Sequence, residues 1–220
     1  MDMPVPDPLA NPDRRYVRHS REYLASQRWT AERVRRELVD ERHPAPRYEF
    51  LDGELIVSPS PELRHQLLVV ELTHRLRPYV EAQRLGRVVN SPSDVAVAPD
   101  STTQPDVFVI PADEVARVLA RRGHEPVRRL QLAVEVLSPS SGRVDRLKKR
   151  RFYGRNGVAD YWVVDPDARV FETSVAGDER VTLHDATLRW QPEGAAEGWA
   201  LDVAGLFADM LGPPGDAESR

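Results

Sequence analysis

Cysteine is absent from the 220-residue chain, which excludes disulfides, a cysteine nucleophile and thiolate zinc sites. The six histidines show no metal-ligand spacing, so a histidine zinc site is not expected either. Long apolar runs are also missing, because no segment approaches the roughly 20 residues that span a bilayer. The N-terminus lacks a basic end followed by an apolar stretch. We therefore expect a cytoplasmic protein without a membrane segment.

The chain has no excess of positive charge. Its net charge of -4 and pI near 5.9 argue against a polycation that binds nucleic acid indiscriminately. Locally the balance differs, because residues 143–155 hold seven basic side chains against one acid, and a second arginine-rich stretch runs from Arg14 to Arg36. These stretches fit solvated helix faces and phosphate contact about equally well.

The length and an ordinary share of hydrophobic residues, 40%, predict one globular domain. We place that domain at residues 14–208. Residues 1–13 and 209–220 are rich in proline and polar groups, so we expect both ends to be disordered.

The N-terminal half contains clear signals for helices and a hairpin. Near-helical spacing between residues 16 and 42 predicts one or two helices, one capped by Thr30, which Pro44 and Pro46 terminate. Residues 47–57 read as a hairpin that turns at Asp52-Gly53. Residues 62–83 form a long amphipathic pattern with Pro78 near its end.

The remainder alternates apolar strands with helices. Short strands are predicted at 87–90, 94–98, 106–110, 130–137 and 160–165, with edge strands of a C-terminal β-meander at 170–174 and 180–183. Helices are predicted from a cap at Asp113 to Leu119, and over 143–156. This order predicts an α/β (mixed α+β) fold with a mixed central β-sheet flanked by helices.

Two carboxylates lie on apolar strands. Asp106 precedes Val107-Phe-Val-Ile110, and Glu135 interrupts Leu130-Gln-Leu-Ala-Val-Glu-Val-Leu137. A charge on a buried strand costs several kcal/mol, of order 2–7, unless it is paired or binds a metal. If the two strands are neighbours, the carboxylates converge, and with a nearby lysine they would suit a divalent-metal phosphodiesterase.

The lysine must come from outside the strand. Metal nucleases of this type often carry it two residues after the glutamate, where this chain has Leu137. On the helix that follows Gly142, Asp145, Lys149 and Tyr153 are spaced four apart and share one face. Lys149 can reach the carboxylates if this helix returns over the end of the strand.

A series of ordered motifs carries a family resemblance. They are Tyr48-Glu-Phe-Leu-Asp-Gly-Glu54, His65-Gln66, Ser93-Asp94-Val95, Gln104-Pro-Asp-Val107, Val134-Glu-Val-Leu-Ser-Pro-Ser140, Asp145, Lys149, Tyr153, Gly157-Val158 and Tyr161-Trp-Val-Val-Asp-Pro166. Over residues 29–207 the chain closely resembles the Uma-type family of restriction endonucleases, in the PD-(D/E)XK nuclease superfamily. The resemblance implies a restriction-endonuclease-like core.

The resemblance also implies a site. Asp106 and Glu135 would hold Mg²⁺ or Mn²⁺, with the backbone carbonyl of Val136 as a further ligand. Lys149 would orient the attacking water or offset the charge that develops on phosphorus, and Lys148 takes this role if the register slips by one. Supporting roles fall to Glu54 and Asp94 as ligands or water-orienting groups, to His65 near the phosphate, and to Tyr153.

Simpler interpretations stay open for each residue. Asp106 could cap a turn, Glu135 could pair with Arg129, and Lys149 could form an exposed salt bridge with Asp145. Glu54 and Asp94 could serve a hairpin or a strand end, His65 could be a surface or packing residue, and Tyr153 is most simply a core aromatic.

The sequence thus predicts a metal-dependent endonuclease that hydrolyses phosphodiester bonds of nucleic acid, and DNA is the substrate we expect. Two-strand cutting would suit a homodimer. The alternative is a catalytically inactive protein of the nuclease fold that serves in binding or interaction. A metal hydrolase that acts on other substrates is a distant third.

Overall fold

The computed structural model of the chain describes residues 24, 27–38, 47–58, 60–121, 125–138, 141–178 and 180–213. The predicted disordered N-terminus, both ends of the region 16–42 in which one or two helices are predicted, and the proline helix stops at residues 44 and 46 lie outside these residues.

The first described elements follow the sequence prediction. Helix α2 (Ala31–Glu37) begins after Thr30, whose hydroxyl accepts a hydrogen bond from the Arg33 amide at 3.1 Å. Strands β1 (Arg47–Leu51) and β2 (Glu54–Ser58) pair as an antiparallel hairpin. Its turn residues, Asp52 and Gly53, have φ values of 55° and 78°, so both adopt the left-handed conformation that the Asp-Gly pair predicts.

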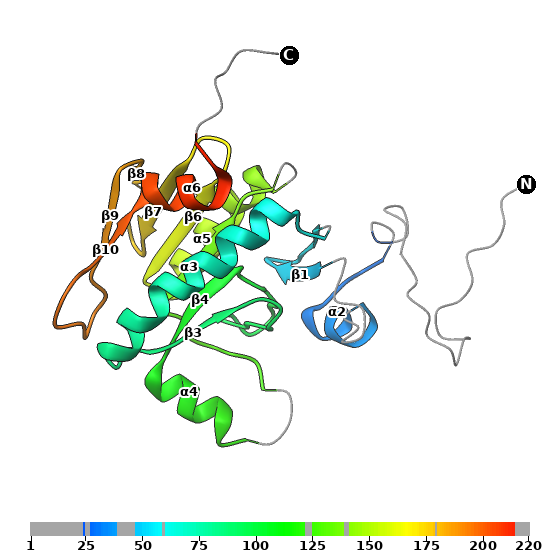
Figure 1. Cartoon of the computed structure of the whole chain (residues 1–220). Helices are drawn as coiled ribbons and strands as arrows, with labels where there is room; N and C mark the ends of the chain where they lie inside the picture. The colour runs from blue at the N-terminus through cyan, green and yellow to red at the C-terminus, as the bar shows by residue number, and fades with distance from the viewer. Residues whose placement is uncertain are drawn as a thin grey trace, which may run out of the picture.

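A six-stranded mixed sheet forms the centre of the molecule (Figure 1). Strands β5 and β6 pair in parallel, and all other neighbours pair antiparallel. The strand order is β3 (Gly86–Asn90), β4 (Val107–Pro111), β5 (Leu132–Val136), β6 (Asp160–Asp165), β7 (Val170–Val175) and β8 (Thr182–His184). This arrangement confirms the predicted mixed α/β fold.

The strand predicted at 94–98 is wrong. Val95 makes only isolated bridges, to Thr103 and to Val127. Pro92 and Pro99 flank the segment, and because proline has no amide hydrogen, a continuous ladder cannot extend in either direction.

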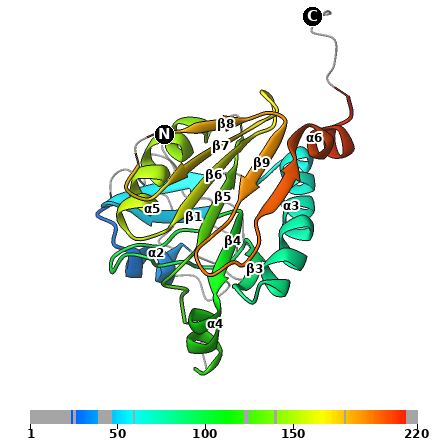
Figure 2. The same ribbon diagram turned by 90° about the vertical axis from the view of Figure 1, so that its left-hand side faces the viewer.

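Helices cover both faces of the sheet (Figure 2). Helix α3 (Leu63–Ala82), which contains Pro78, packs on one face with Val134 and Val136 of β5. The π-helix η1 (Val144–Lys149) and helix α5 (Arg150–Arg155) lie on the other, where Ala133 and Leu137 belong to a second core. Successive residues of β5 therefore face opposite cores. The regular helix expected over 143–156 begins as a π-helix.

Helix α4 (Ala112–Leu119) starts two residues earlier than predicted. Pro111 ends β4 and occupies the cap position, so Asp113 lies inside the first turn. Its carboxylate there accepts a hydrogen bond from the Glu114 amide at 2.9 Å. An acid in the first turn is still favourable for the helix dipole.

The C-terminal part contains elements that the sequence did not reveal. Strands β7 and β8 confirm the meander, but β9 (Thr187–Trp190) and β10 (Trp199–Asp202) form a separate hairpin, followed by helix α6 (Val203–Leu211). Trp162 stacks on Trp199 at 6.1 Å, which fixes this hairpin against the α3 side of the sheet. We expected disorder from residue 209, but α6 continues to Leu211, which packs against the core. No helix in the described part of the chain is long and apolar enough to span a membrane.

Candidate active site

Asp106 lies immediately before β4 and is held from three directions. Its Oδ1 accepts a hydrogen bond from Arg47 Nη1 at 2.8 Å, and its Oδ2 lies 2.9 Å from His65 Nε2. The amide of Val136 donates to the same Oδ2 at 2.9 Å, which ties this residue to the end of β5. Burial raises the pKa of Asp106, but the His65 hydrogen bond and the Arg47 charge outweigh it and hold the pKa well below its usual range.

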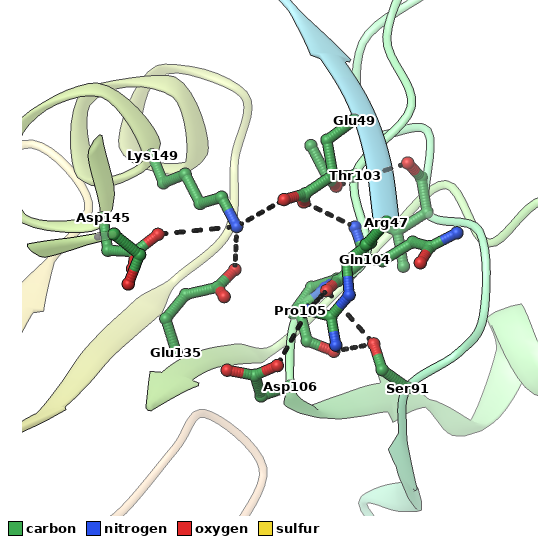
Figure 3. A network of polar contacts seen from close by, with 12 residues as sticks. Arg47, Glu49, Ser91, Thr103, Gln104, Pro105, Asp106, Glu135, Asp145 and Lys149 are labelled. Carbon is green, nitrogen blue, oxygen red and sulfur yellow. Dashed lines mark hydrogen bonds and ion pairs between the residues drawn. The ribbon is translucent and has the colours of Figure 1, made fainter. Parts of the chain in front are cut away.

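Lys149 is buried at the end of η1 and points into a group of three carboxylates (Figure 3). Its Nζ lies 2.8 Å from Glu49 Oε2, 3.0 Å from Glu135 Oε1 and 3.5 Å from Asp145 Oδ1. Burial alone would lower the pKa of Lys149, but the negative charges of Glu135, Glu49 and Asp145 raise it well above its usual value. The amine is therefore held as an ammonium ion.

The carboxylates outnumber the cations at this site. Burial raises the pKa of Glu135, Lys149 lowers it, and the nearby charges of Asp106, Asp145 and Glu49 raise it again, so that the pKa lies well above its usual value. The pKa of Asp145 is raised for the same reasons. Among the described residues, the four acids thus face Lys149 and the Arg47 guanidinium as their permanent cations. Glu135 Oε1 and Glu49 Oε2 are buried, and although Lys149 is within ion-pair distance, neither receives an aligned hydrogen bond.

A cavity of about 180 Å³ opens onto these groups. Its lining includes the charged groups described above, Asp106, Glu135, Asp145, Lys149 and Arg47, together with Val136. Its other lining residues come from the end of β2, the start of α3 and the loop after β5; they are Ser58, Ser60, Pro61, Glu62, His65, Ser138 and Ser141. The cavity therefore lies where β4 begins and β5 ends.

The structure brings some of the predicted residues together and leaves others apart. Asp106, Glu135, Val136, Lys149 and His65 all line the cavity. Lys148 and Glu54 instead form an ion pair at 2.5 Å, with both side chains about half exposed. Lys148 therefore does not reach the carboxylates.

Asp94 and Tyr153 also lie outside the cavity lining. Asp94 is buried and accepts a hydrogen bond from Gln104 Nε2 at 2.9 Å, next to the site rather than in it. Tyr153 is a core aromatic whose ring lies 5.3 Å from that of Tyr161. Both residues support the surrounding structure.

Two simple interpretations of the carboxylates are wrong. Arg129 pairs with Asp113 at the far end of the sheet and does not reach Glu135. Asp106 accepts a backbone amide, but from the neighbouring strand β5 rather than from its own turn. The Lys149–Asp145 pair does form, although it is buried rather than exposed and is the longest of the three contacts of Lys149.

Sequence reasoning missed Glu49 and Arg47. Glu49 stands between Tyr48 and Phe50 on β1 and is fully buried, with its Oε1 accepting a hydrogen bond from the Gln104 amide at 2.8 Å. An acid inside an apolar strand was the signal used for Glu135, and the same signal was available at Glu49. Arg47, at the start of β1, carries no comparable sequence signal.

The cavity suits a hard divalent cation. No group of three or more acidic or histidine side chains surrounds a common metal position in the described part of the chain. Mg²⁺ needs fewer protein ligands than this, because it keeps several waters and binds proteins through one or two carboxylates. Asp106 and Glu135, which line the cavity together with Val136, offer carboxylate oxygens of this kind, and the surplus of carboxylates favours a positive ion.

Comparison with known proteins agrees with this architecture. The Uma2 family model, described as "Putative restriction endonuclease", matches residues 31–204. A solved structure from Anabaena variabilis, described as "a putative nuclease", aligns with a TM-score of 0.67 and 20% identity over 83% of this chain and 99% of its own. That likeness shows a shared fold. No curated protein matches the chain. Because the family match spans most of the sequence, this protein belongs to the Uma2 family.

Proposed function

We propose that this protein is a metal-dependent endonuclease that hydrolyses phosphodiester bonds of nucleic acid. One observation carries the proposal: the buried Lys149 ammonium lies 3.0 Å from Glu135, beside a cavity that Asp106 also lines. Glu135 on strand β5 and Lys149 on the helical segment that follows are thereby adjacent, as hydrolysis of a phosphodiester at such a site requires. Family membership supports the same reaction class.

The residues divide the work by their chemistry. Asp106 and Glu135 would hold Mg²⁺ or Mn²⁺, with the carbonyl of Val136 as a third protein ligand. When bound, such an ion polarises a phosphoryl oxygen and lowers the pKa of a water. Lys149 would orient the attacking water and offset charge that develops on phosphorus. Glu49 and Asp145 keep the ammonium directed toward the cavity when Glu135 takes part in binding the ion.

The substrate we propose is DNA. The cavity is not enclosed, and its lining includes residues near the starts of α3 and η1 and the serines Ser58, Ser60, Ser138 and Ser141, which suits an extended polymer backbone better than a small enclosed ligand. A second copy of the chain would supply a second site for the opposite strand, so a homodimer is part of this proposal.

A second candidate function is supported by the ion pairs of the site, because its charged groups already have partners within the protein. Lys149 is already surrounded by three carboxylates, and Asp106 is already bonded to Arg47 and His65. Such a network could serve stability alone, in a catalytically inactive protein of the nuclease fold that binds or interacts with a partner.

Nicking of supercoiled plasmid and cleavage of single-stranded DNA, with Mg²⁺, Mn²⁺ or a chelator, separate the two functions. We expect metal-dependent cleavage by the wild type, and none by Asp106→Asn or Glu135→Gln, which keep the shape of each side chain. Glu54→Gln is the matched control, because this acid is exposed and outside the cavity. Equal activity in all four proteins would refute the site, and no cleavage by the wild type would favour the inactive alternative.

A further inference from the structure

Arg47 is held rigidly at the edge of the cavity. Its Nη1 donates to the Gln104 carbonyl at 3.0 Å and to Asp106 Oδ1 at 2.8 Å. Only 18% of its side chain is exposed, and it lines the cavity together with Asp106 and Glu135. Both hydrogen bonds come from Nη1. They fix the plane of the guanidinium and do not use Nε or Nη2.

The other donors of Arg47 are free. Within the described ranges, neither Nε nor Nη2 has a hydrogen-bond or ion-pair partner. Lys149, the other permanent cation of the lining, differs in this respect, because three carboxylates surround its ammonium. Arg47 is therefore an ordered cation of the cavity whose Nε and Nη2 donors can bind a ligand.

An anionic substrate needs such a group here. A phosphodiester that enters the cavity approaches Asp106, Glu135 and Asp145, all of which would repel it when ionised. A guanidinium presents parallel N–H groups that match two oxygens of a phosphate, and it stays charged at all relevant pH values. Because Arg47 is already ordered, it loses little conformational freedom when it binds.

From these contacts we infer that Arg47 binds the two non-bridging oxygens of the scissile phosphodiester through Nε and Nη2. The inference rests on the proposed function and names the substrate contact of that same site. The group it recognises is a phosphodiester monoanion with both non-bridging oxygens unsubstituted. Arg47 is thus a substrate-contacting residue, while its bond to Asp106 aligns the phosphate with the metal-binding carboxylate.

Side-chain NMR of the wild-type protein tests the contact without any cleavage. The ¹⁵Nε–H resonance of Arg47, assigned by comparison with Arg47→Lys, is followed during titration with the dinucleotide thymidylyl-thymidine in the absence of divalent metal. We expect this resonance to shift with the dinucleotide and to stay in place with thymidine, which has no phosphate. An Arg47 resonance that does not move with the dinucleotide would overturn the inference.

Cleavage kinetics supply the second test. Arg47→Met should lower kcat/KM by about 10²–10³-fold, and Arg47→Lys, which keeps the charge but not the paired donors, should recover only part of it. Arg129→Met is the control, because that arginine is exposed and pairs with Asp113 away from the cavity. Thermal unfolding shows whether each variant remains folded.

The two proposals fail differently. If the wild type cleaves DNA and folded Arg47→Met cleaves it equally well, the phosphate contact is wrong and the nuclease function stands. If the wild type does not cleave any substrate but the Arg47 resonance shifts with the dinucleotide, the contact stands and the nuclease function fails.

Discussion

The ammonium of Lys149 lies 2.8 Å from Oε2 of Glu49, although one residue belongs to the π-helix and the other to the N-terminal hairpin. The contact links the N-terminal hairpin to the helical segment that carries Lys149. Because both side chains are buried, removal of Lys149 leaves Glu49 without its counter-ion, whereas removal of the Glu49 charge still leaves Lys149 with Glu135 and Asp145.

Lys149→Met should therefore both destabilise and inactivate the protein. We expect the free energy of unfolding to fall by about 3–5 kcal/mol, since three carboxylates lose their counter-ion. Cleavage should fall by about 10²–10³-fold. Urea denaturation and plasmid nicking measure the two effects. Lys148→Met, one residue away in an exposed pair with Glu54, should change stability by less than about 1 kcal/mol and leave cleavage intact.

Glu49→Gln should weaken the site by a smaller amount. The amide keeps the hydrogen bond from the Gln104 backbone, and Lys149 keeps Glu135 and Asp145 as partners. We expect cleavage to fall by about 10–100-fold, as for other residues that orient a ligand rather than bind it. Glu49→Asp should restore less than full activity, because the shorter side chain does not reach as far. If Glu49→Gln cleaves like the wild type, Glu49 has only a structural role.

The stability of the protein should depend on pH through Glu135. Its pKa is raised in the folded state, so the fold disfavours the ionised form. The stability associated with the neutral carboxyl is present below the unfolded pKa and is lost as pH rises through the folded pKa. Glu135→Gln stays neutral, so its stability relative to the wild type should increase with pH, by up to about 1.4 kcal/mol per pH unit. Urea denaturation at a series of pH values without divalent metal measures this difference, and a constant difference across pH would contradict it.

Asp106→Asn should show the opposite dependence on pH. The pKa of this carboxyl is lowered by His65 and Arg47, so its ionised form stabilises the fold above the unfolded pKa, and that stability is lost as pH falls through the folded pKa. We expect the variant to be less stable than the wild type by about 3–5 kcal/mol at neutral pH, because Arg47 loses its buried partner. This difference in stability between the variant and the wild type should become smaller only in strongly acidic solution. A gap that is independent of pH would show that lost packing, rather than lost charge, causes it.

Mg²⁺ should stabilise the wild type independently of any cleavage. At a concentration about 100 times the dissociation constant, a ligand specific to the folded state adds about 2.7 kcal/mol to the free energy of unfolding. Asp106→Asn and Glu135→Gln should lose this gain, while Glu54→Gln should keep it. Thermal unfolding across a Mg²⁺ titration measures the effect. A gain that is equal in all four proteins would mean that the ion binds elsewhere.

Local patterns in the sequence were sufficient for much of the fold. The Asp52-Gly53 turn, the long helix before residue 83 and the apolar strand around Glu135 follow from conformational preference and hydrophobic pattern, which act over a few residues. Local patterns could not show that residues 94–98 do not form a strand, and they could not predict the C-terminal hairpin. Val95 forms isolated bridges with Thr103 and Val127. The hairpin of β9 and β10 depends on the contact of Trp162 with Trp199 across the core.

For the site, the sequence by itself determined which side chains are too costly to bury without a partner. An acid among apolar strand residues marked Glu135, and helical spacing favoured Lys149, which the structure places beside it. Only the tertiary structure decided the partners. It brought Glu49 to Lys149 and Arg47 to Asp106 by packing the N-terminal hairpin over the end of the sheet, through the bridge between Phe50 and Thr102. Electrostatic contacts between segments that are distant in the chain depend on that packing, and no local pattern encodes it.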